Sequence, residues 1–308
     1  MTLRGGYMTD GQFAFAIVAA VLAFHLLIIG APLAYSFWLS LHETNIILRS
    51  QEYVGFDLWQ EALENEDVID ATWRSLWFAA MVTVFSFVLS LAIALVLDME
   101  FPFRGLLRAL VLMPWAISEI VTAGLWTMMI DPGWGVFNGI LVPLGIVEEG
   151  FVWLNEDWAL FWVAVAFVWH IAPLGAFFFL AALQSIPKAL YGAARIDGAG
   201  PIARFWYVTL PHIRYAVLIV LVVMTVDAFR QFDLVFAFTA GGPGTVTLVL
   251  PMQIYRFNFN LSQYGLASAT SFILIIIATI LACAYFFLLS RRRHVTRAVD
   301  EVKAAPAA

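Results

Sequence analysis

Apolar residues along the chain gather into six long runs that polar segments separate. The runs cover approximately residues 13–41, 75–97, 106–130, 158–184, 215–238 and 266–290. A helix that crosses a bilayer needs about 20 mostly apolar residues, and each run reaches that length. The first run is longer than the apolar part of a signal peptide, which is typically about 7–15 residues, so we expect it to be retained as a helix. The pattern therefore predicts six membrane-spanning helices.

Basic residues are shared unevenly between the two sets of polar segments. The segments 42–74, 131–157 and 239–265 hold 13 acidic residues but only Arg49, Arg74 and Arg256. The other segments and the mouth of the third run hold 12 of the 16 Lys and Arg residues, namely Arg4, Arg104, Arg108, Lys188, Arg195, Arg204, Arg214, Arg291, Arg292, Arg293, Arg297 and Lys303. Because Lys and Arg collect in cytoplasmic loops, we predict that this second set and both termini are cytoplasmic, which requires an even number of spans.

Composition favours a membrane protein over a soluble domain. The 308 residues are 63% hydrophobic and 12% charged, whereas soluble domains are about 45–50% apolar and about 25% charged. The net charge of −6 does not indicate a nucleic-acid partner, and Cys283, the one cysteine, allows no disulfide within the chain. We predict an all-α integral membrane protein with a single transmembrane domain over residues 1–308.

The polar segment 185–214 has the pattern of two short helices set at an angle. Pro187 can begin a helix, which the stretch KALYGAARID continues. The glycines and proline of 198–201 predict a sharp turn, and IARFWYVTL predicts a second helix that Pro211 ends. A merely solvated connector would not explain its apolar residues, which are Ile202, Phe205, Trp206 and Val208. We therefore expect a docking element on the cytoplasmic face.

This segment resembles the EAA loop of the membrane subunits of binding-protein-dependent ABC importers. That pattern runs Glu-Ala-Ala, three residues, Gly, nine residues, Ile, any residue and Leu-Pro, and the chain keeps the spacing with Gly192 in place of Glu and Val208 in place of Ile. Gly192 removes a carboxylate that could pair with the ATPase, so this contact is dispensable or another residue supplies it. We call 185–214 the coupling loop. The expected ATPase-coupling residues are Gly192, Ala193, Ala194, Asp197, Gly198, Phe205, Trp206, Leu210 and Pro211.

Two further motifs are similar to those of sugar permeases. The stretch 112–138 resembles their third core helix with the loop behind it, and RQFDLVFAFTAGGPG (230–244) resembles their fifth helix with its following signature. The likeness is to the first permease of maltose, lactose or glycerol-phosphate type. It implies the six-helix core of a type I ABC importer in a bacterial or archaeal cytoplasmic membrane. It also implies a heterodimer with a second permease, two ATPase subunits and an extracytoplasmic solute-binding protein that delivers a sugar.

The sequence predicts that the energy source lies outside this chain. A loop that cradles phosphates needs glycines followed by Lys and then Ser or Thr. The two lysines, Lys188 and Lys303, do not follow a glycine. We therefore expect no catalytic residues, no metal site and no cofactor in this chain, with ATP and Mg²⁺ bound by the partner ATPase.

Ionisable groups inside the predicted spans are candidates for the transport pathway, since each costs about 2.5–3.5 kcal/mol on insertion scales. Carboxylates and amides hydrogen-bond sugar hydroxyls, and an aromatic ring packs on the C–H face of a sugar. The alternatives are that Asp227 and Arg230 only neutralise each other, that Glu119 faces the partner permease or a water-filled vestibule, and that His170 only packs. Helical spacing can place Asp227, Arg230 and Gln231 on one face. The expected substrate-binding residues are Trp115, Glu119, His170, Asp227, Arg230 and Gln231.

The resemblance to maltose-type permeases adds positions to this set. An alignment without gaps at Leu210-Pro211 and Pro173 brings the positions that line the sugar site of that branch onto Trp115, Phe167, His170, Ile171, Leu174, Met224, Asp227, Ala228 and Gln231. Leu174 and Ala228 depart from the aromatic and amide residues expected for maltose. The departure favours a different sugar, or a larger contribution from the partner permease.

The expected mechanism is alternating access driven by the ATPases through the coupling loop. One rival is a secondary transporter driven by a proton or Na⁺ gradient through Glu119 and Asp227. Pro114 and Pro173 could break helices at the midplane in such a protein, but the long cytoplasmic loop has no role in it. A second rival is a membrane scaffold without cargo, against which the intramembrane charges argue.

Overall fold

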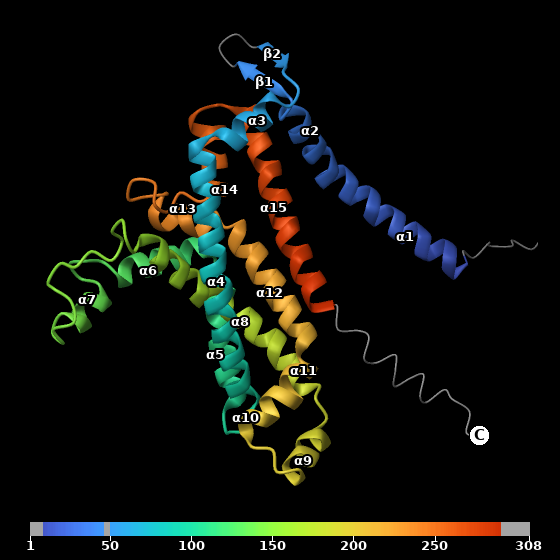
Figure 1. The fold of residues 1–308 in the computed structure, drawn as a ribbon, viewed down its shortest axis with the longest axis vertical. Helices are drawn as coiled ribbons and strands as arrows, with labels where there is room; N and C mark the ends of the chain where they lie inside the picture. Colours follow the sequence, from blue (N-terminus) through green and yellow to red (C-terminus); the bar gives the residue numbers. More distant parts are fainter. Residues whose placement is uncertain (1–8, 46–49, 291–308) are drawn as a thin grey trace, which may run out of the picture. The chain divides into compact units, whose positions relative to one another are not determined.

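A computed structural model of the chain describes residues 9–45 and 50–290, and Figure 1 shows the order of its elements. The chain divides into two compact units. Unit 1 comprises Met1–Asn65 and Ile254–Ile273, and unit 2 comprises Glu66–Gln253 and Leu274–Ala308. The predicted orientation depends in part on basic residues that lie outside the described residues, namely Arg4, Arg49, the run at 291–293, Arg297 and Lys303. The single domain over 1–308 and the orientation of its termini stay predictions.

Unit 1 begins with a long apolar helical segment. It consists of α1 (Asp10–His25), the π-helical η1 (Leu26–Gly30) and α2 (Ala31–Leu39). Thr9 and Gln12 form a capping box at its start, in which each side chain accepts a backbone N–H of the other. The stretch Gly11–Leu39 is long and apolar enough to cross a bilayer, and no residue of its most apolar window is buried.

A small β-hairpin follows, which the expectation of an all-α chain did not include. β1 (His42–Asn45) pairs antiparallel with β2 (Ser50–Tyr53), so that His42 lies opposite Tyr53. The strands read HETN and SQEY, and they lack the alternation of apolar and polar residues by which a half-buried strand is recognised. Next comes α3 (Asp57–Glu64), which buries Leu58 and Ala62.

The helices α14 (Leu250–Tyr255), η3 (Arg256–Asn260) and α15 (Tyr264–Ser290) complete the described chain. Near the start of α15, a side chain at Gly265 would collide with the backbone of His42 and with the side chain of Leu58. This glycine therefore lets α15 approach the residues around the hairpin within unit 1.

Two long helices of unit 2, α4 (Glu66–Asp98) and α8 (Ala159–Gln184), pack along each other through small residues. Ser86, Ser90 and Ala94 of α4 are buried, and Ser90 Oγ donates to the backbone carbonyl of Ala172 at 2.7 Å. A side chain at Gly175 would collide with Ser90 and with Met224. Small interface residues let helix backbones approach closely, which is how helices associate where lipid supplies no hydrophobic drive.

The third apolar run forms two helices, α5 (Arg104–Ala116) and α6 (Glu119–Met129), bent by 97° to each other. Pro114 removes a backbone donor in the last turn of α5. Ile117 and Ser118 are extended, and Ser118 Oγ accepts the backbone N–H of Val121 as the N-cap of α6. The helix expected over 106–130 is therefore interrupted near its middle.

The fifth run is interrupted as well. α12 (Arg214–Phe229) and α13 (Asp233–Thr239) are separated by residues 230–232. The helix expected over 215–238 thus consists of two pieces, and the break falls among the residues predicted to bind substrate. Both breaks lie in unit 2.

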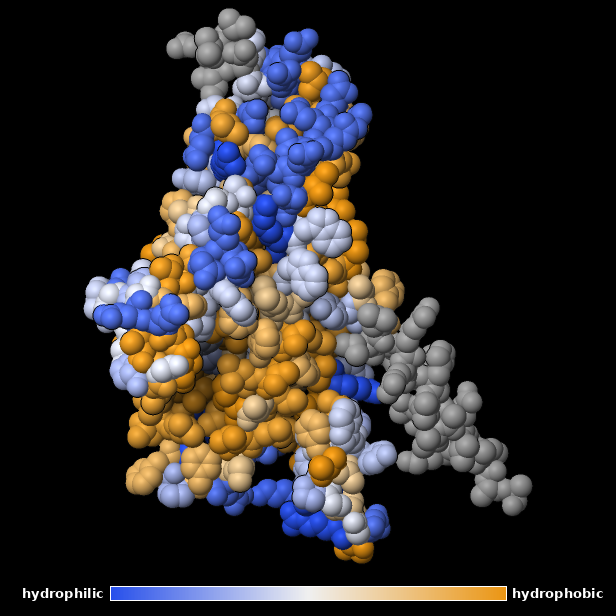
Figure 2. Space-filling model, turned by 60° about the vertical axis from the view of Figure 1, so that its left-hand side comes forward, coloured by the Kyte–Doolittle hydropathy of each residue, from blue (hydrophilic) through white to orange (hydrophobic). Residues whose placement is uncertain are grey.

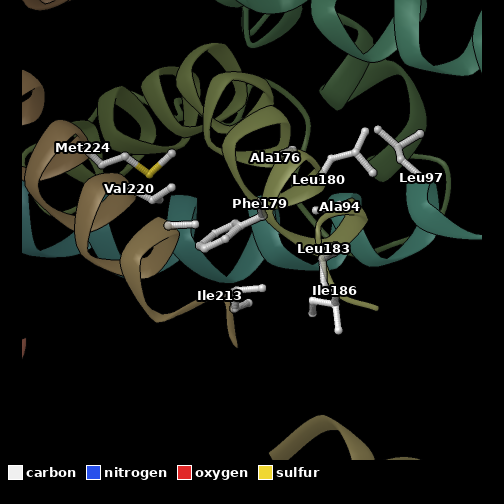
Figure 3. Packing of buried hydrophobic residues seen from close by; sticks show 11 residues of the cluster. Ala94, Leu97, Ala176, Phe179, Leu180, Leu183, Ile186, Ile213, Val220 and Met224 are labelled. Carbon is white, nitrogen blue, oxygen red and sulfur yellow. The ribbon is translucent and has the colours of Figure 1, made fainter. Parts of the chain in front are cut away.

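The helices α4, α8 and α12 share an apolar core in unit 2 (Figure 3). Phe179 and Ile213 are fully buried in it. Partly buried residues of the coupling loop, Tyr191, Val208 and Leu210, pack against the same core. The loop is therefore joined by side-chain packing to the membrane-spanning helices.

By length and composition, four helices of the described residues can each cross a bilayer: Gly11–Leu39, Glu66–Asp98, Ala159–Gln184 and Tyr264–Phe287. The number reaches six if each of the two strongly bent pairs, Arg104–Ala116 with Glu119–Met129 and Pro201–His212 with Arg214–Phe229, is one span. The short α7 (Val136–Leu141) lies in the loop after α6. In Figure 2, hydrophobic side chains cover the body of the helices of unit 2, and the foot of the view, where the coupling loop lies, shows hydrophilic side chains with hydrophobic ones among them. A predominantly helical membrane protein is confirmed.

Candidate functional site: a charged cluster at two helix breaks and a cytoplasmic loop

The break between α12 and α13 lies beside the start of α6. Glu119 is the first residue of α6, and its carboxylate lies close to the side chain of Gln231. A carboxylate is favoured at a helix N-terminus by the helix dipole. Gln231 is buried, with 4% of its surface exposed. The two broken helices pack against each other, and Glu119 and Gln231 approach where α6 and α13 begin.

Asp227 and Arg230 form an ion pair at the end of α12. Arg230 Nη2 and Nε donate to Asp227 Oδ1 at 2.6 and 3.0 Å. Asp233, the first residue of α13, and both members of this pair lie close enough to Glu119 to interact with it electrostatically. We call the five residues Glu119, Asp227, Arg230, Gln231 and Asp233 the α6–α13 cluster. It combines three carboxylates with one guanidinium, so its formal charge is negative.

The structure corrects the reason given for placing Gln231 in this set. The α-helix ends at Phe229, so Gln231 does not share a helical face with Asp227. Its Oε1 instead accepts the backbone N–H of Leu234 at 3.4 Å, in the first turn of α13. The break brings Gln231 to Glu119, which an unbroken helix would not do.

Asp227 and Arg230 do form the neutralising pair considered from the sequence, yet the pair is not fully buried within the chain. The side chain of Arg230 is 67% exposed and that of Asp227 is 22% exposed. A buried ion pair whose only role is structural keeps both partners away from other ligands, whereas this guanidinium is open to one.

His170 lies at the break between α5 and α6. It is 6% exposed, and its Nδ1 lies 2.9 Å from the backbone carbonyl oxygen of Pro114 and 3.4 Å from Thr122 Oγ1. His170 of α8 therefore contacts residues on both sides of the break, Pro114 in α5 and Thr122 in α6. Trp115, next to this carbonyl, is 44% exposed.

Most of the positions that the alignment with maltose-type permeases added are buried within the chain. Phe167, Ile171, Met224 and Ala228 are each no more than 3% exposed, and Leu174 is half-buried. In this conformation the first four form part of the interior of unit 2. Their expected contact with a sugar stays a prediction.

The coupling loop folds into two short helical segments. α9 (Lys188–Ile196) ends in a turn, in which the backbone N–H of Ala199 donates to the carbonyl of Ala194 at 2.8 Å. Gly198 has φ +80°, a left-handed conformation that glycine adopts without a Cβ clash. This arrangement is a Schellman-type helix end, and it fixes the angle at which the second segment leaves.

The second segment runs further than the sequence indicated. It contains α10 (Pro201–Arg204), the π-helical η2 (Phe205–Thr209) and α11 (Leu210–His212), so Pro211 lies inside it and does not end it. In η2 the backbone N–H of Leu210 donates to the carbonyl of Phe205, one residue further back than in an α-helix. Wider turns of this kind accommodate a proline that has no N–H to donate.

Several large apolar side chains of this loop are exposed. Trp206 is 58% exposed, whereas Phe205 and Val208 are partly buried. The most exposed apolar residues, Ile196 at 89%, Tyr207 at 82% and Ile202 at 76%, were not among the expected coupling residues. Tyr207 follows directly on two expected anchors, so the sequence carried a signal for it.

Polar contacts hold the loop together and to its neighbour. The hydroxyls of Tyr191 and Thr209 are 3.0 Å apart and join the two segments. Lys188 Nζ donates to Glu100 Oε1 at 3.0 Å, which links α9 to the turn after α4. This hydrogen bond, the charge of Lys188 and that of Arg104 lower the pKa of the exposed Glu100 below its ordinary value.

A family profile described as "Binding-protein-dependent transport system inner membrane component" matches residues 86–294. The chain is 34% identical over 283 residues to the trehalose/maltose transport system permease protein MalF of Thermococcus litoralis, covering 88% of this chain and 92% of the relative. It is also 34% identical over 259 residues to the sn-glycerol-3-phosphate transport system permease protein UgpA of Salmonella typhimurium, covering 83% of this chain and 86% of the relative.

Solved structures share the fold. A chain of a bacterial ABC transporter involved in the import of the acidic polysaccharide alginate matches with a TM-score of 0.78 at 22% identity, covering 91% of this chain and 96% of the other. The alginate transporter in complex with an alginate pentasaccharide-bound periplasmic protein matches with a TM-score of 0.77 at 22% identity, covering 89% and 92%.

Proposed function

The chain belongs to the family of binding-protein-dependent transport system inner membrane components, and it is therefore a permease subunit of an ABC importer of the sugar type; we propose that its cargo is a neutral saccharide or polyol. The relatives named above are described by both kinds of cargo, neutral trehalose and maltose in one case and anionic glycerol phosphate in the other. The chemistry of the α6–α13 cluster distinguishes these two classes.

The observation that carries the proposal is the excess of carboxylates in that cluster. The cluster holds three carboxylates, Glu119, Asp227 and Asp233, but a single guanidinium, Arg230, which Asp227 already binds. A phosphate or carboxylate cargo would be repelled by this excess of negative charge. Neutral hydroxyls instead donate hydrogen bonds to carboxylates, and such bonds to charged groups contribute about 1.5–3 kcal/mol each.

The partners follow from the family and from the coupling loop. We infer a heterodimer with a second permease, two ATPase subunits that bind ATP and Mg²⁺, and an external binding protein that delivers the saccharide. The exposed apolar side chains of the coupling loop give the ATPases a docking surface in the cytoplasm. This chain would then hydrolyse no ATP itself. It would lie in the inner membrane with both termini in the cytoplasm.

The packing of the coupling loop supports a mechanical role in alternating access. ATP-driven closure of the two ATPases would move the loop, and Tyr191, Val208 and Leu210 would carry that movement into the core of α4, α8 and α12. A loop packed in this way transmits force as a rigid body. The cavity between the permeases would open outward to take the saccharide and inward to release it.

The proposal is tested by uptake into proteoliposomes that contain the full complex with its binding protein and enclosed ATP. We expect uptake of a neutral disaccharide or polyol that continues when a protonophore collapses the proton gradient, and Glu119→Gln should reduce it about tenfold through loss of a charged hydrogen bond. The matched control, Glu149→Gln in an exposed outer loop, should transport normally. Uptake without the ATPases, or transport of only anionic cargo, would refute the proposal.

A further inference from the structure

A charged cleft of about 660 Å³ is lined by the turn after α4, the start of α5, the end of α8 and one side of α9. Four basic side chains line it, those of Arg104, Arg108, Lys188 and Arg195, with two acidic ones, Asp98 and Glu100. Lys188 is paired with Glu100. In the described part of the chain, no other ion pair joins the lining residues, so the cleft keeps an excess of positive charge.

Two arginines of this cleft lie at the start of α5. Arg104 and Arg108 are one turn apart at the start of α5, where the helix dipole disfavours cations and attracts anions. Arg108 Nη2 donates to the backbone carbonyl of Leu97 at 2.9 Å, but its Nε is buried without a hydrogen-bond partner. A guanidinium has five donors in a planar fork that suits a phosphate group.

An apolar groove of about 240 Å³ lies on two of the elements that line the cleft, α4 and α5. Its walls are apolar residues of α4 and α5, namely Ala92, Ile93, Val96, Leu97, Leu107 and Val111. The two linings are adjacent along the chain at two places, since Leu97 precedes Asp98 and Leu107 precedes Arg108. A basic cleft and an apolar groove thus neighbour each other along a helix that is long enough to cross the bilayer.

We propose that this composite site binds an anionic phospholipid of the cytoplasmic leaflet, with its phosphate in the cleft and one acyl chain in the groove. Basic pockets between membrane helices on the cytoplasmic side have the chemistry for such headgroups, and that leaflet carries the anionic lipids. The groove argues for a lipid over a soluble phosphate or an acidic protein segment, since neither of these would cover an apolar surface between two helices.

The lipid would touch the coupling loop as well as α4 and α5. Tyr191, Gly192 and Arg195 of α9 line the cleft, so a bound phosphate joins α9 to the start of α5. Binding itself does not depend on the proposed cargo. Only the consequence, that the lipid stiffens the link to the ATPases, rests on the proposed function.

Native mass spectrometry of the purified complex tests the site. The probes are dioleoyl phosphatidylglycerol and, with the same chains, zwitterionic dioleoyl phosphatidylcholine. We expect selective retention of the anionic lipid, and a loss of about fivefold in its apparent affinity for each of Arg104→Gln and Arg195→Gln, since each basic residue near a membrane surface contributes about that factor. Arg214→Gln, an exposed cytoplasmic arginine outside the cleft, is the control and should retain the lipid normally.

A second variant tests the groove independently of charge. Ala92→Trp fills it and should weaken retention of the anionic lipid several-fold, whereas Ala109→Trp, on the exposed surface of α5 outside the groove, should not. The proposal is overturned if both arginine variants retain the lipid as Arg214→Gln does, or if free sn-glycerol 3-phosphate displaces it at millimolar concentration. Loss of the ATPases from the arginine variants with unchanged lipid retention would assign the cleft to a protein interface. These readouts involve no sugar uptake, so they are separate from failure of the proposed function.

Discussion

The coupling loop and the α6–α13 cluster break the usual placement of residues in opposite ways, the loop by exposing apolar side chains and the cluster by placing charged ones within apolar helices. The loop exposes large apolar side chains outside the apolar helices, with Ile196 at 89% and Tyr207 at 82% exposure. The cluster gathers charged side chains within the helices that are predicted to cross the membrane. An exposed apolar patch indicates a protein partner, and an intramembrane charge indicates a pathway. On this ground we propose that the loop binds the ATPases and that the cluster binds the transported solute.

The two regions also differ in how their geometry is fixed. The loop has a helix end set by a left-handed glycine, a hydroxyl contact between its segments and apolar packing into the core. The cluster depends on helix breaks and on a few side-chain hydrogen bonds at their ends. A rigid part suits transmission of force, whereas a part with few contacts can rearrange around a ligand. A substitution in the loop should therefore abolish binding of the ATPases, whereas a substitution in the cluster should reduce uptake without abolishing it.

The largest expected effect comes from Gly198→Leu. A leucine must adopt φ +80° there, at a cost of about 1 kcal/mol or more, or else the turn between the two segments changes. Nothing lies within 4 Å of the new Cβ, so the effect is on the turn and not on packing. We expect the ATPase to be lost on co-purification while the permease still inserts.

Gly145→Leu is the matched control for this change. Gly145 has φ +69°, and a Cβ there also meets nothing within 4 Å, but it lies in the loop after α7. It should bear similar backbone strain and still co-purify with the ATPase. If Gly198→Leu binds the ATPase as well as Gly145→Leu does, the loop is not the docking element.

The sequence predicted the coupling loop better than the cluster for a physical reason. The turn at 198–201 is dictated locally by Gly and Pro, and the apolar residues after it needed a partner, so spacing along the chain was enough. The wide turn at η2 was missed, because proline was taken to end a helix that a π-helical segment continues.

The α6–α13 cluster could be predicted only in part. The cost of burying charge identified Glu119, Asp227 and Arg230, but the contact between Glu119 and Gln231 joins residues far apart in sequence. It exists because both helices break, and the break after Phe229 contains no proline or glycine to announce it. The β-hairpin was missed for a related reason, since its short polar strands are held by pairing with each other and not by an apolar face.

An intermediate effect is expected from Asp227→Asn. The change leaves Arg230 without its charged partner and removes a charged acceptor for a sugar hydroxyl, which contributes about 1.5–3 kcal/mol. Uptake of the neutral cargo should fall about tenfold or more, with normal binding of the ATPase. This outcome is the graded response that the comparison predicts.

Asp70→Asn controls for the loss of a carboxylate from an ion pair. Asp70 Oδ2 accepts from Arg74 Nη2 at 2.9 Å near the start of α4, and Asp70 is 64% exposed. Exposed pairs of this kind contribute little, so uptake should stay normal. If Asp227→Asn and Asp70→Asn show equal uptake, Asp227 has only the structural role of neutralising Arg230.

The smallest expected effect concerns the pair that links the loop to the turn after α4. Lys188 lowers the pKa of Glu100, so this contact stabilises the protein at a pH above the ordinary value for Glu, 4.5, and is lost as the pH falls through the lowered pKa. Lys188→Gln should therefore lower Tm by about 1 °C at pH 7, because both side chains are exposed, and should lower it less near pH 3. Thermal unfolding of the detergent-purified complex at both pH values measures the difference. If the Tm difference between the wild type and Lys188→Gln instead grows on acidification, the ion pair does not join these segments. Packing through Tyr191, Val208 and Leu210 would then be the link between the coupling loop and the membrane helices.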